Sequence, residues 1–409
     1  MGEIVKILAS ILGTDLGKVI ENVKAMWEKL FPPNGESIFD EKKIIGSLEP
    51  IYITLIAPRG AGKTSLLSTI LQYMQEQVSD TAGVEVKPCK EEDAKRMQKF
   101  HEQLTTFIKA KKFEFTSAGD PNAAINKFEF EIEFTRIPNA VIKQKFVVMD
   151  IPGGIINDAQ KNSEFEEHLE KSRILWIPVE ANALMEGLDG SAKVKTGREN
   201  VLCTTLMGDR LKKWAKKRLN FKGVPCSANF VMMKSESYFS HRDNDSQPFQ
   251  VSEKFDREYG KTISDVHLIN QDVDMSYVPV ETIGVIKKYQ SDWIEKDGKI
   301  VLKCVYQFDT NAERVDIKGV DRLMYNVLDY CNTSLATKLD KTKTEIDKVV
   351  KELDDMNFIL KMKFKKEIAA AKELQENIHE LVDGLQPLKD KLSELKQPSD
   401  YSKKYSRML

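Results

Sequence analysis

The feature that most constrains this chain is residues 57–64, Ala-Pro-Arg-Gly-Ala-Gly-Lys-Thr, which stand between two apolar stretches. Before them, residues 51–56 form a short apolar run of the kind that predicts a buried strand. After them, apolar residues recur over residues 66–71 with the spacing of a helix. A strand that enters a helix through a loop ending in Gly-Lys-Thr fits the phosphate-loop pattern, with Ala57 in place of the first glycine.

The geometry of such a loop explains its residue types. Its backbone N–H groups wrap a polyphosphate, and the helix that follows directs its positive end toward the same anion. Gly60 and Gly62 let the backbone approach closely. We expect Lys63 to reach the β and γ phosphates and the Thr64 hydroxyl to bind Mg²⁺. The competing interpretation is a glycine-containing turn before a surface helix. The remaining residues expected to bind the nucleotide here are Arg59, Ala61 and Ser65.

A second pattern lies downstream of this loop. Apolar and charged residues alternate over residues 127–134, which predicts a half-exposed strand. Pro138 marks a turn, and residues 145–149 predict a second strand, so the two strands form an antiparallel hairpin. The second strand leads directly into Asp150-Ile-Pro-Gly153.

A phosphate loop followed by a hairpin and Asp-x-x-Gly resembles the Ras-like and translation-factor class of P-loop GTPases. The resemblance implies an α/β domain with a mixed, mostly parallel sheet and helices on both faces, binding GTP or GDP with Mg²⁺. It also implies that Asp150 holds Mg²⁺ through water and that the N–H of Gly153 meets the γ-phosphate. Most ATPases of the AAA or transporter type carry a second acidic residue after the aspartate, whereas Ile151 stands here. ATP is therefore the less favoured nucleotide.

The first base-reading motif of that class is matched loosely. The apolar run 229–233 predicts a strand, and Lys234-Ser-Glu236 follows it. The class has Asn-Lys-x-Asp here, so Met233 replaces the asparagine and cannot make its contacts to the phosphate loop. The resemblance places Lys234 over the guanine ring and pairs Glu236 with the N–H and amino groups of the base. The alternative is a plain strand end.

The second base-reading motif is weaker. Residues 278–285 resemble the last base-contacting loop, and Ile283 and Gly284 stand where the class has Ser-Ala. This match gains weight from its order along the chain. The whole resemblance covers residues 48–335.

The sequence departs from the class at the catalytic position. In Ras-like proteins a glutamine directly after Asp-x-x-Gly orients the attacking water, whereas Gly154 has no side chain to do so. Hydrolysis must then be slow, or use a residue from elsewhere in the chain or from a partner. Arg59 is a candidate charge stabiliser, although a solvent-facing arginine fits the loop as well. For the switch I residue that binds Mg²⁺ we take Thr116, with Ser117 as the next choice.

Three segments follow from the pattern along the chain. Residues 1–47 predict an N-terminal amphipathic helical segment. Docking on the body is favoured for it over peripheral contact with a membrane surface. Residues 48–335 form the GTPase domain, with a helical insert near residues 90–110. Residues 336–409 form a tail that predicts one long helix or coiled coil.

The tail and one internal helix carry further expectations. Apolar residues keep heptad spacing in two runs, 339–360 and 374–395, which favours a coiled coil or a helical hairpin. The tail would pair with itself, with a second subunit or with the body, and its last residues, 398–409, are expected to be loose. Residues 197–219 predict one helix with a basic face, which is either solvated or contacts a phosphate-rich partner.

Composition excludes several other classes. The 409 residues carry 62 basic and 63 acidic side chains, so overall charge does not favour nucleic acid. The five cysteines lie far apart, which argues for isolated thiols in a reducing compartment. No apolar run approaches the roughly 20 residues of a membrane span. We therefore expect a cytoplasmic protein.

The sequence as a whole predicts a GTP-driven switch. Loops around Thr116 and Gly153 would be ordered by the γ-phosphate and released by hydrolysis. The helical insert and the tail would transmit that change to a protein partner or to self-association. Two alternatives remain open: a P-loop ATPase, and a scaffold that binds nucleotide without hydrolysing it.

Overall fold

The computed structural model describes most of the chain in a series of segments. These are residues 50–58, 60–74, 76, 84–110, 126–137, 140–151, 162–186, 191–220, 225–296, 298–309, 315–355, 361–362, 365–384, 390, 393 and 397–409. The chain divides into two compact units. The first, the body, comprises Pro50–Ile132, Gln144–Tyr330 and Leu392–Leu409; the second, the helical unit, comprises Met1–Glu49, Glu133–Lys143 and Cys331–Lys391. The predicted N-terminal helices lie outside the described residues.

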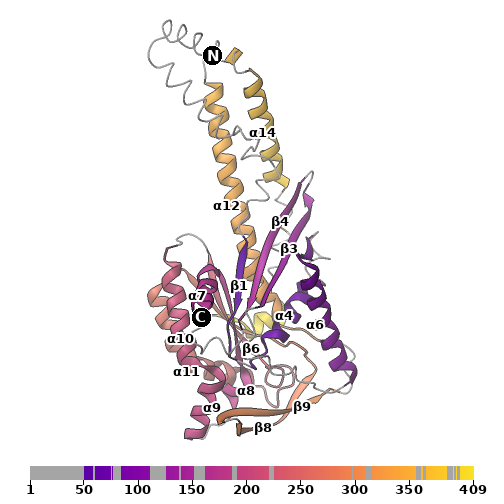
Figure 1. Cartoon of the computed structure of the whole chain (residues 1–409), viewed down its shortest axis with the longest axis vertical. Helices are drawn as coiled ribbons and strands as arrows, with labels where there is room; N and C mark the ends of the chain where they lie inside the picture. The colour runs from indigo at the N-terminus through magenta and orange to yellow at the C-terminus, as the bar shows by residue number, and fades with distance from the viewer. Residues whose placement is uncertain are drawn as a thin grey trace. The chain divides into compact units, whose positions relative to one another are not determined.

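An eight-stranded mixed sheet organises the chain, with strand order β10-β7-β6-β5-β1-β4-β3-β2 (Figure 1). Neighbours from β7 to β4 are parallel, and β10 pairs antiparallel with β7. The mostly parallel α/β sheet expected from the sequence is therefore present. The strands are β1 (Ile51–Leu55), β2 (Val84–Pro88), β3 (Asn126–Ile137), β4 (Ala140–Asp150), β5 (Ile174–Glu180), β6 (Cys226–Met233), β7 (Val273–Pro279) and β10 (Arg407–Met408).

The path of the chain creates a switch point beside β1. From β1 the chain adds β4 on one side and later β5 on the other. Loops that leave the carboxyl ends of β1, β4 and β5 therefore diverge and leave room between them, which is where open α/β sheets bind ligands.

Helices cover both faces of this sheet. In Figure 1, α10 and α11 lie on one side of the sheet and α4 on the other. The core between the sheet and α11 is aromatic: Phe230 of β6 packs on Phe255 and Tyr259, with ring centroids 5.1 and 5.2 Å apart. The helices are α4 (Lys63–Tyr73), α6 (Glu91–Ala110), α7 (Asn162–Lys171), α8 (Ala181–Met185), α9 (Ala192–Leu202), α10 (Thr204–Arg218), α11 (Gln247–Ile269), α12 (Val320–Asp354), α14 (Lys365–Gly384) and α16 (Asp400–Tyr405).

The helix α6 occupies the segment in which the sequence predicted a helical insert. The single helix predicted over residues 197–219 is wrong, because two helices meet there at Cys203. That residue has φ 49° and ends α9 while it begins α10. The helix α11 begins at Gln247.

The basic face of α10 is paired within the fold. Lys213 lies 2.8 Å from Glu166 of α7, and Arg210 binds the same carboxylate. Lys217 forms an ion pair with Glu170, also on α7. These acids neutralise much of the basic cluster, so the face offers less charge to a phosphate-rich partner than its sequence indicates.

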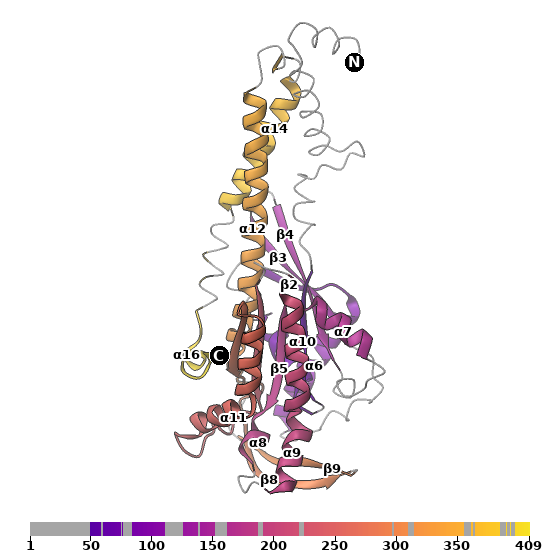
Figure 2. The ribbon, with the colours of Figure 1, turned by 90° about the vertical axis from the view of Figure 1, so that its left-hand side faces the viewer.

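A two-stranded hairpin, β8 (Ile286–Lys296) and β9 (Lys299–Phe308), begins directly after the loop that follows β7. It lies beside α8 and α9 (Figure 2). Trp293 is buried on Gly197, where an added Cβ would lie 2.4 Å from the indole ring. Asn200 of α9 donates to the carbonyl of Ile300 at 3.1 Å. The hairpin is thus anchored along α9.

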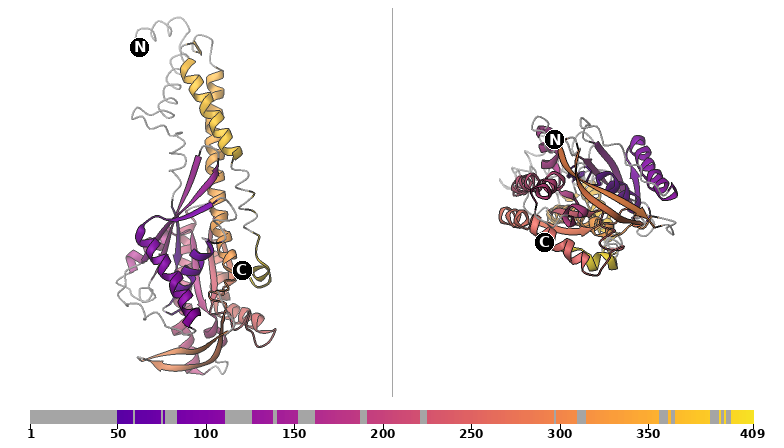
Figure 3. Two further views of the ribbon diagram at one scale, coloured as in Figure 1. Left: turned by 90° about the vertical axis from the view of Figure 1, so that its right-hand side faces the viewer. Right: turned by 90° about the horizontal axis from the view of Figure 1, so that it is seen from below.

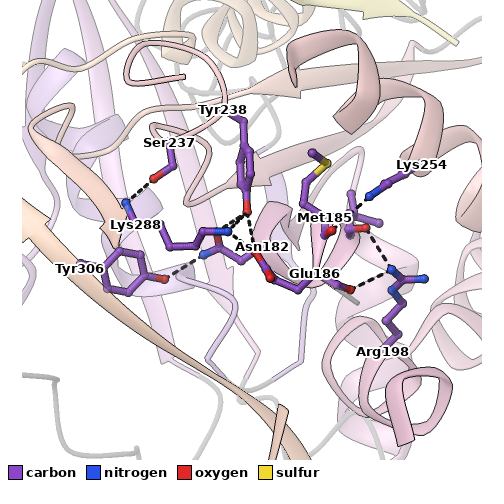
Figure 4. A network of polar contacts seen from close by, with 10 residues as sticks. Asn182, Met185, Glu186, Arg198, Ser237, Tyr238, Lys254, Lys288 and Tyr306 are labelled. Atoms are coloured by element: carbon purple, nitrogen blue, oxygen red, sulfur yellow. Dashed lines mark hydrogen bonds and ion pairs between the residues drawn. The ribbon is translucent and has the colours of Figure 1, made fainter. Parts of the chain in front are cut away.

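A polar network ties the same hairpin to the sheet (Figure 4). Lys288 of β8 forms an ion pair with Glu186 and donates to the Tyr238 hydroxyl at 2.9 Å. Tyr238 in turn donates to Asn182 at 3.0 Å, and Asn182 donates to the Tyr306 hydroxyl at 2.9 Å. The network places β9 close to the carboxyl ends of β5 and β6.

The C-terminal residues dock on the body, so the expectation of a loose end is wrong. Asp321, in the first turn of α12, accepts from Ser399 N at 2.8 Å and from Ser402 Oγ at 2.7 Å. Tyr401 packs against Phe239 with ring centroids 6.2 Å apart. The strand β10 then extends the sheet beyond β7.

In the helical unit, α12 and α14 run antiparallel and side by side (Figure 3). Asp347 accepts from Gln375 at 2.7 Å and contacts His379 at 2.9 Å, while Lys372 lies 2.8 Å from Asp354. Residues later in α12 contact residues earlier in α14, so the two helices form an antiparallel helical hairpin. Buried residues of this hairpin are Ile346, Val350, Leu353 and Ala371. In the part of the chain that is described, no helix is long and apolar enough to cross a membrane.

Candidate nucleotide site

The structure brings the predicted site residues that it describes to one edge of the sheet. The phosphate loop follows β1, and Asp150 ends the neighbouring strand β4, directly opposite Leu55 in the register. Lys234 and Glu236 follow β6, and the loop with Ile283 and Gly284 follows β7. Four carboxyl ends of parallel strands therefore carry the residues that the motifs selected.

The phosphate loop has the backbone that its glycines predict. Gly60 and Gly62 have φ 84° and 89°, in the left-handed region that favours glycine. Gly62 caps α4 without a side-chain hydrogen bond, and the first turn of α4 contains no acidic residue. The N–H groups and the positive end of α4 therefore face the loop without an acidic neighbour on that turn.

Lys63 folds back over its own loop. Its Nζ donates to the carbonyls of Ala57 at 2.8 Å and Pro58 at 3.0 Å. Burial lowers the pKa of this ammonium, and the nearby charge of Asp150 opposes that effect. Two weak acceptors hold a cation here, and a phosphate would be a much stronger partner for it.

Asp150 has the opposite electrostatic balance. Burial raises the pKa of its carboxyl group, while Lys63 lowers it. Its Oδ1 is buried and accepts no hydrogen bond from the described residues. An orphaned carboxylate oxygen beside the loop of residues 57–64 fits a water-coordinated Mg²⁺. Within the described ranges, no group of three or more His, Cys, Asp or Glu could hold a metal by itself.

Met233 contacts the phosphate loop through an apolar surface. A Cβ added to Gly62 would lie 3.0 Å from Met233 Cε, so the thioether packs against the loop where the GTPase class uses an asparagine amide. Lys234 has φ 57°, and its Nζ donates to Glu180 Oε1 at 2.6 Å. Glu180 ends β5 and lies opposite Met233 in the β5–β6 register.

Glu236 is turned into the fold. Its side chain is 5% exposed, and its Oε1 accepts from the N–H groups of Thr282 at 3.1 Å and Ile283 at 3.4 Å. Burial raises the pKa of this carboxyl group, against the effect of the backbone donors. The carboxylate therefore shapes the loop after β7, and its predicted contact with guanine remains a prediction.

That loop is tightly packed. Gly284 has φ 73°, and an added Cβ would lie 2.0 Å from the carbonyl of Asp316. Ile283 is 6% exposed. On the other side, the Thr69 hydroxyl of α4, which donates to the carbonyl of Ser65 at 2.7 Å, lies 3.5 Å from the carbonyl of Thr282. The loop thus contacts the helix that begins at the phosphate loop.

Two functional candidates were missed in the sequence, Glu180 and Glu281. Glu281 is 0% exposed, and its Oε2 lies 3.3 Å from Lys318 Nζ. Burial raises its pKa to about 7, and the charge of Glu236 adds to that increase. No local sequence pattern identifies either residue, because the residues that each one contacts lie on another strand or loop.

Several predicted residues cannot be placed. Arg59, Thr116, Gly153 and Gly154 lie outside the described residues, and for Thr64 only the backbone, in the first turn of α4, is described. No protein-family model matches this chain, and no curated protein matches it.

Proposed function

We propose that the body is a P-loop GTPase of the Ras-like class that binds GTP and Mg²⁺ at the carboxyl edge of the sheet. The observation that carries the proposal is the pair formed by Lys63 and Asp150. These two half-buried, oppositely charged groups lie at the carboxyl ends of adjacent parallel strands, beside the glycine loop at the start of α4. The strand order, with β1 between β4 and β5, supports the same reading.

In this proposal each residue has one task. Lys63 leaves the Ala57 and Pro58 carbonyls and binds the β and γ phosphates, while the N–H groups of the loop hold the remaining oxygens. Asp150 and Thr64 would hold Mg²⁺, which would supply positive charge to offset that of the phosphates. Gly154 supplies no side chain to orient water. Hydrolysis is therefore slow, or depends on a residue supplied by a partner.

Contacts within the body support a switch function. Thr69, on the helix that begins at the phosphate loop, contacts the loop after β7. At the other end of α4, burial and the charge of Asp321 raise the pKa of Tyr73 to about 12. Asp321 lies in the first turn of α12, the helix that continues into the helical unit. Tyr73 and Asp321 therefore lie near each other, and in this proposal α12 transmits a change at α4 to a partner or to self-association.

The test is triphosphate binding by the full chain and by Lys63→Ala. We expect the substitution to remove at least the roughly 1.5–3 kcal/mol of a hydrogen bond to a charged group. Lys95→Ala is the matched control, because Lys95 is an exposed lysine that pairs only with Glu91 among the described residues. Titration with fluorescent GTP and ATP, with and without Mg²⁺, measures the affinities, and circular dichroism checks the fold.

Equal affinity of the parent and Lys63→Ala for both triphosphates would contradict the proposal. An ATPase remains the second candidate, because Glu236 is occupied by backbone N–H groups and not presented to a base. A preference for ATP over GTP in the same titration would select it. Single-turnover hydrolysis then separates a slow GTPase from a scaffold that holds its nucleotide unchanged.

A further inference from the structure

Two acidic residues compete for the task of reading the base. Glu236 has the position of the class motif, but two backbone N–H groups occupy its Oε1. Glu180 stands at the end of β5, one strand away, and no motif includes it. Among the described residues, the Glu180 side chain binds Lys234, and it does so through its Oε1 atom.

Glu180 is held close to the phosphate loop. It pairs in register with Met233, and Met233 packs on Gly62. Its partner Lys234 is 33% exposed, whereas the Glu180 side chain is 8% exposed. The ion pair therefore connects the buried strand end to the surface of the carboxyl edge, beside the loop that would hold the phosphates.

The surroundings of Glu180 would strengthen a polar contact to a base. Burial raises the pKa of Cys304 and of Tyr306, and the negative charge of Glu180 adds to both increases, so both side chains of β9 lie near the carboxylate. Asn182 fixes the Tyr306 hydroxyl at 2.9 Å. Hydrogen bonds in such a partly desolvated site are stronger than the same bonds in water.

Carboxylate chemistry decides which base fits. An ionised carboxylate only accepts hydrogen bonds, and it has room for about four. Guanine presents two neighbouring donors, the ring N–H and the exocyclic amino group. Adenine presents an acceptor at the corresponding ring nitrogen, and xanthine replaces the amino group by an acceptor oxygen. Oε1 of Glu180 can keep Lys234 while Oε2 accepts from guanine.

We propose that Glu180, positioned by Lys234, is the residue that selects guanine, and that Glu236 serves the fold of the loop after β7. This inference rests on the proposed nucleotide site. It differs from the motif-based expectation, which gives the base to Glu236.

The experiment compares Glu180→Gln with Glu236→Gln in the full chain. Both substitutions keep the shape of the side chain. The Glu180→Gln amide can still accept from Lys234, and its NH₂ group can donate to the exocyclic oxygen of xanthine. The Glu236→Gln amide oxygen can still accept from Thr282 and Ile283. Affinities for GTP, XTP and ATP are measured by competition against one fluorescent triphosphate.

We expect the parent and Glu236→Gln to prefer GTP over XTP by about tenfold or more, the factor of one hydrogen bond to a charged group. Glu180→Gln should lose GTP affinity by a similar factor and gain XTP affinity. An unchanged GTP to XTP ratio in Glu180→Gln, or a reversal in Glu236→Gln instead, overturns the assignment.

Failure of the underlying site gives a different result. If the parent binds no triphosphate, or binds it equally after Lys63→Ala, the nucleotide site itself is refuted and the assignment falls with it. If binding depends on Lys63 but Glu180→Gln has the same ratio of GTP to XTP affinity as the parent, the phosphate site is supported and only the base assignment is wrong. A Glu180→Gln protein that has lost its fold by circular dichroism is replaced by Glu180→Asp, which keeps the charge, shortens the reach and should weaken GTP without favouring XTP.

Discussion

Replacing Glu281 by glutamine is expected to flatten the pH dependence of the stability of the body. Glu281 is 0% exposed, and burial raises its pKa from an ordinary value of 4.5 to about 7. The charged groups that face it are Glu236, which raises the pKa further, and Lys318, which lowers it. Lys318 also pairs with Asp316 at 2.9 Å. Burial raises the pKa of Tyr401, and the charge of Glu281 adds to that increase, so the Tyr401 side chain lies near the same carboxylate.

The sign follows from the direction of this pKa change. Between about pH 4.5 and 7 the native protein keeps a proton that the unfolded chain has released, so the free energy of unfolding falls as pH rises through this range. A pKa difference of about 2.5 corresponds to about 3 kcal/mol at 1.36 kcal/mol for each pKa unit. Glutamine cannot ionise, so the free energy of unfolding of Glu281→Gln should not fall in this way as pH rises. Glu281→Gln should therefore be the more stable protein above pH 7.

Urea unfolding at several values between pH 5 and 8 measures the effect. Fluorescence reports on the body through its buried tryptophans, Trp176, Trp214 and Trp293. Glu85→Gln, at an exposed position on β2, is the control and should keep the slope of the parent. Parallel curves for the parent and Glu281→Gln would refute the reasoning, because they would mean that Glu281 does not hold its proton in the folded state.

Two further predictions concern packing. Gly197→Ala should lower the melting temperature, because its Cβ would lie 2.4 Å from the Trp293 ring and overpacking costs about 1–3 kcal/mol; Gly260→Ala, on α11, has no atom within 4 Å and is the control. Asp321→Ala should free the C-terminal residues 397–409, so limited trypsin digestion followed by mass spectrometry should detect cleavage there before it does in the parent, and identical cleavage rates would contradict the docking contact.

The phosphate loop could be predicted because its signal is local. Eight consecutive residues combine a strand end, two glycines and a helix start, and the structure has the left-handed backbone at Gly60 and Gly62 that this pattern requires. The strand that ends at Asp150 was visible for the same reason, since apolar residues lead directly into it. Local constraint on the backbone survives in a single sequence.

The base side of the site could not be predicted in the same way. Glu180 meets Lys234 because β5 and β6 are parallel neighbours in one register, and 54 residues separate the two along the chain. Glu236 is buried because backbone N–H groups of a later loop turn toward it. Backbone donors are present at every residue except proline and carry no sequence signal, so the motif alone assigned this carboxylate to the base.

Edge elements were missed for a related reason. The strand β2 has five residues and β10 has two, which is too short for alternation to be recognised. The chain breaks between α9 and α10 at Cys203, and no glycine or proline at that position indicates the break in the sequence. In each case tertiary contacts override a local pattern that is weak or points the other way.

The C-terminal segment shows how a polar sequence becomes ordered without any periodic pattern of its own. Without β10, β7 would be an edge strand and would offer unpaired backbone groups to any segment that can reach it. Leu409 N donates to the carbonyl of Met275 at 3.0 Å, a contact that does not depend on side chains. Tyr401 and Tyr405 add aromatic contacts to Phe239, which is 1% exposed. The docking therefore depends on β7, Phe239 and Asp321, all distant in sequence. The composition of residues 398–409 describes the segment but not the surface on which it docks. A prediction from that composition alone therefore favours a loose end.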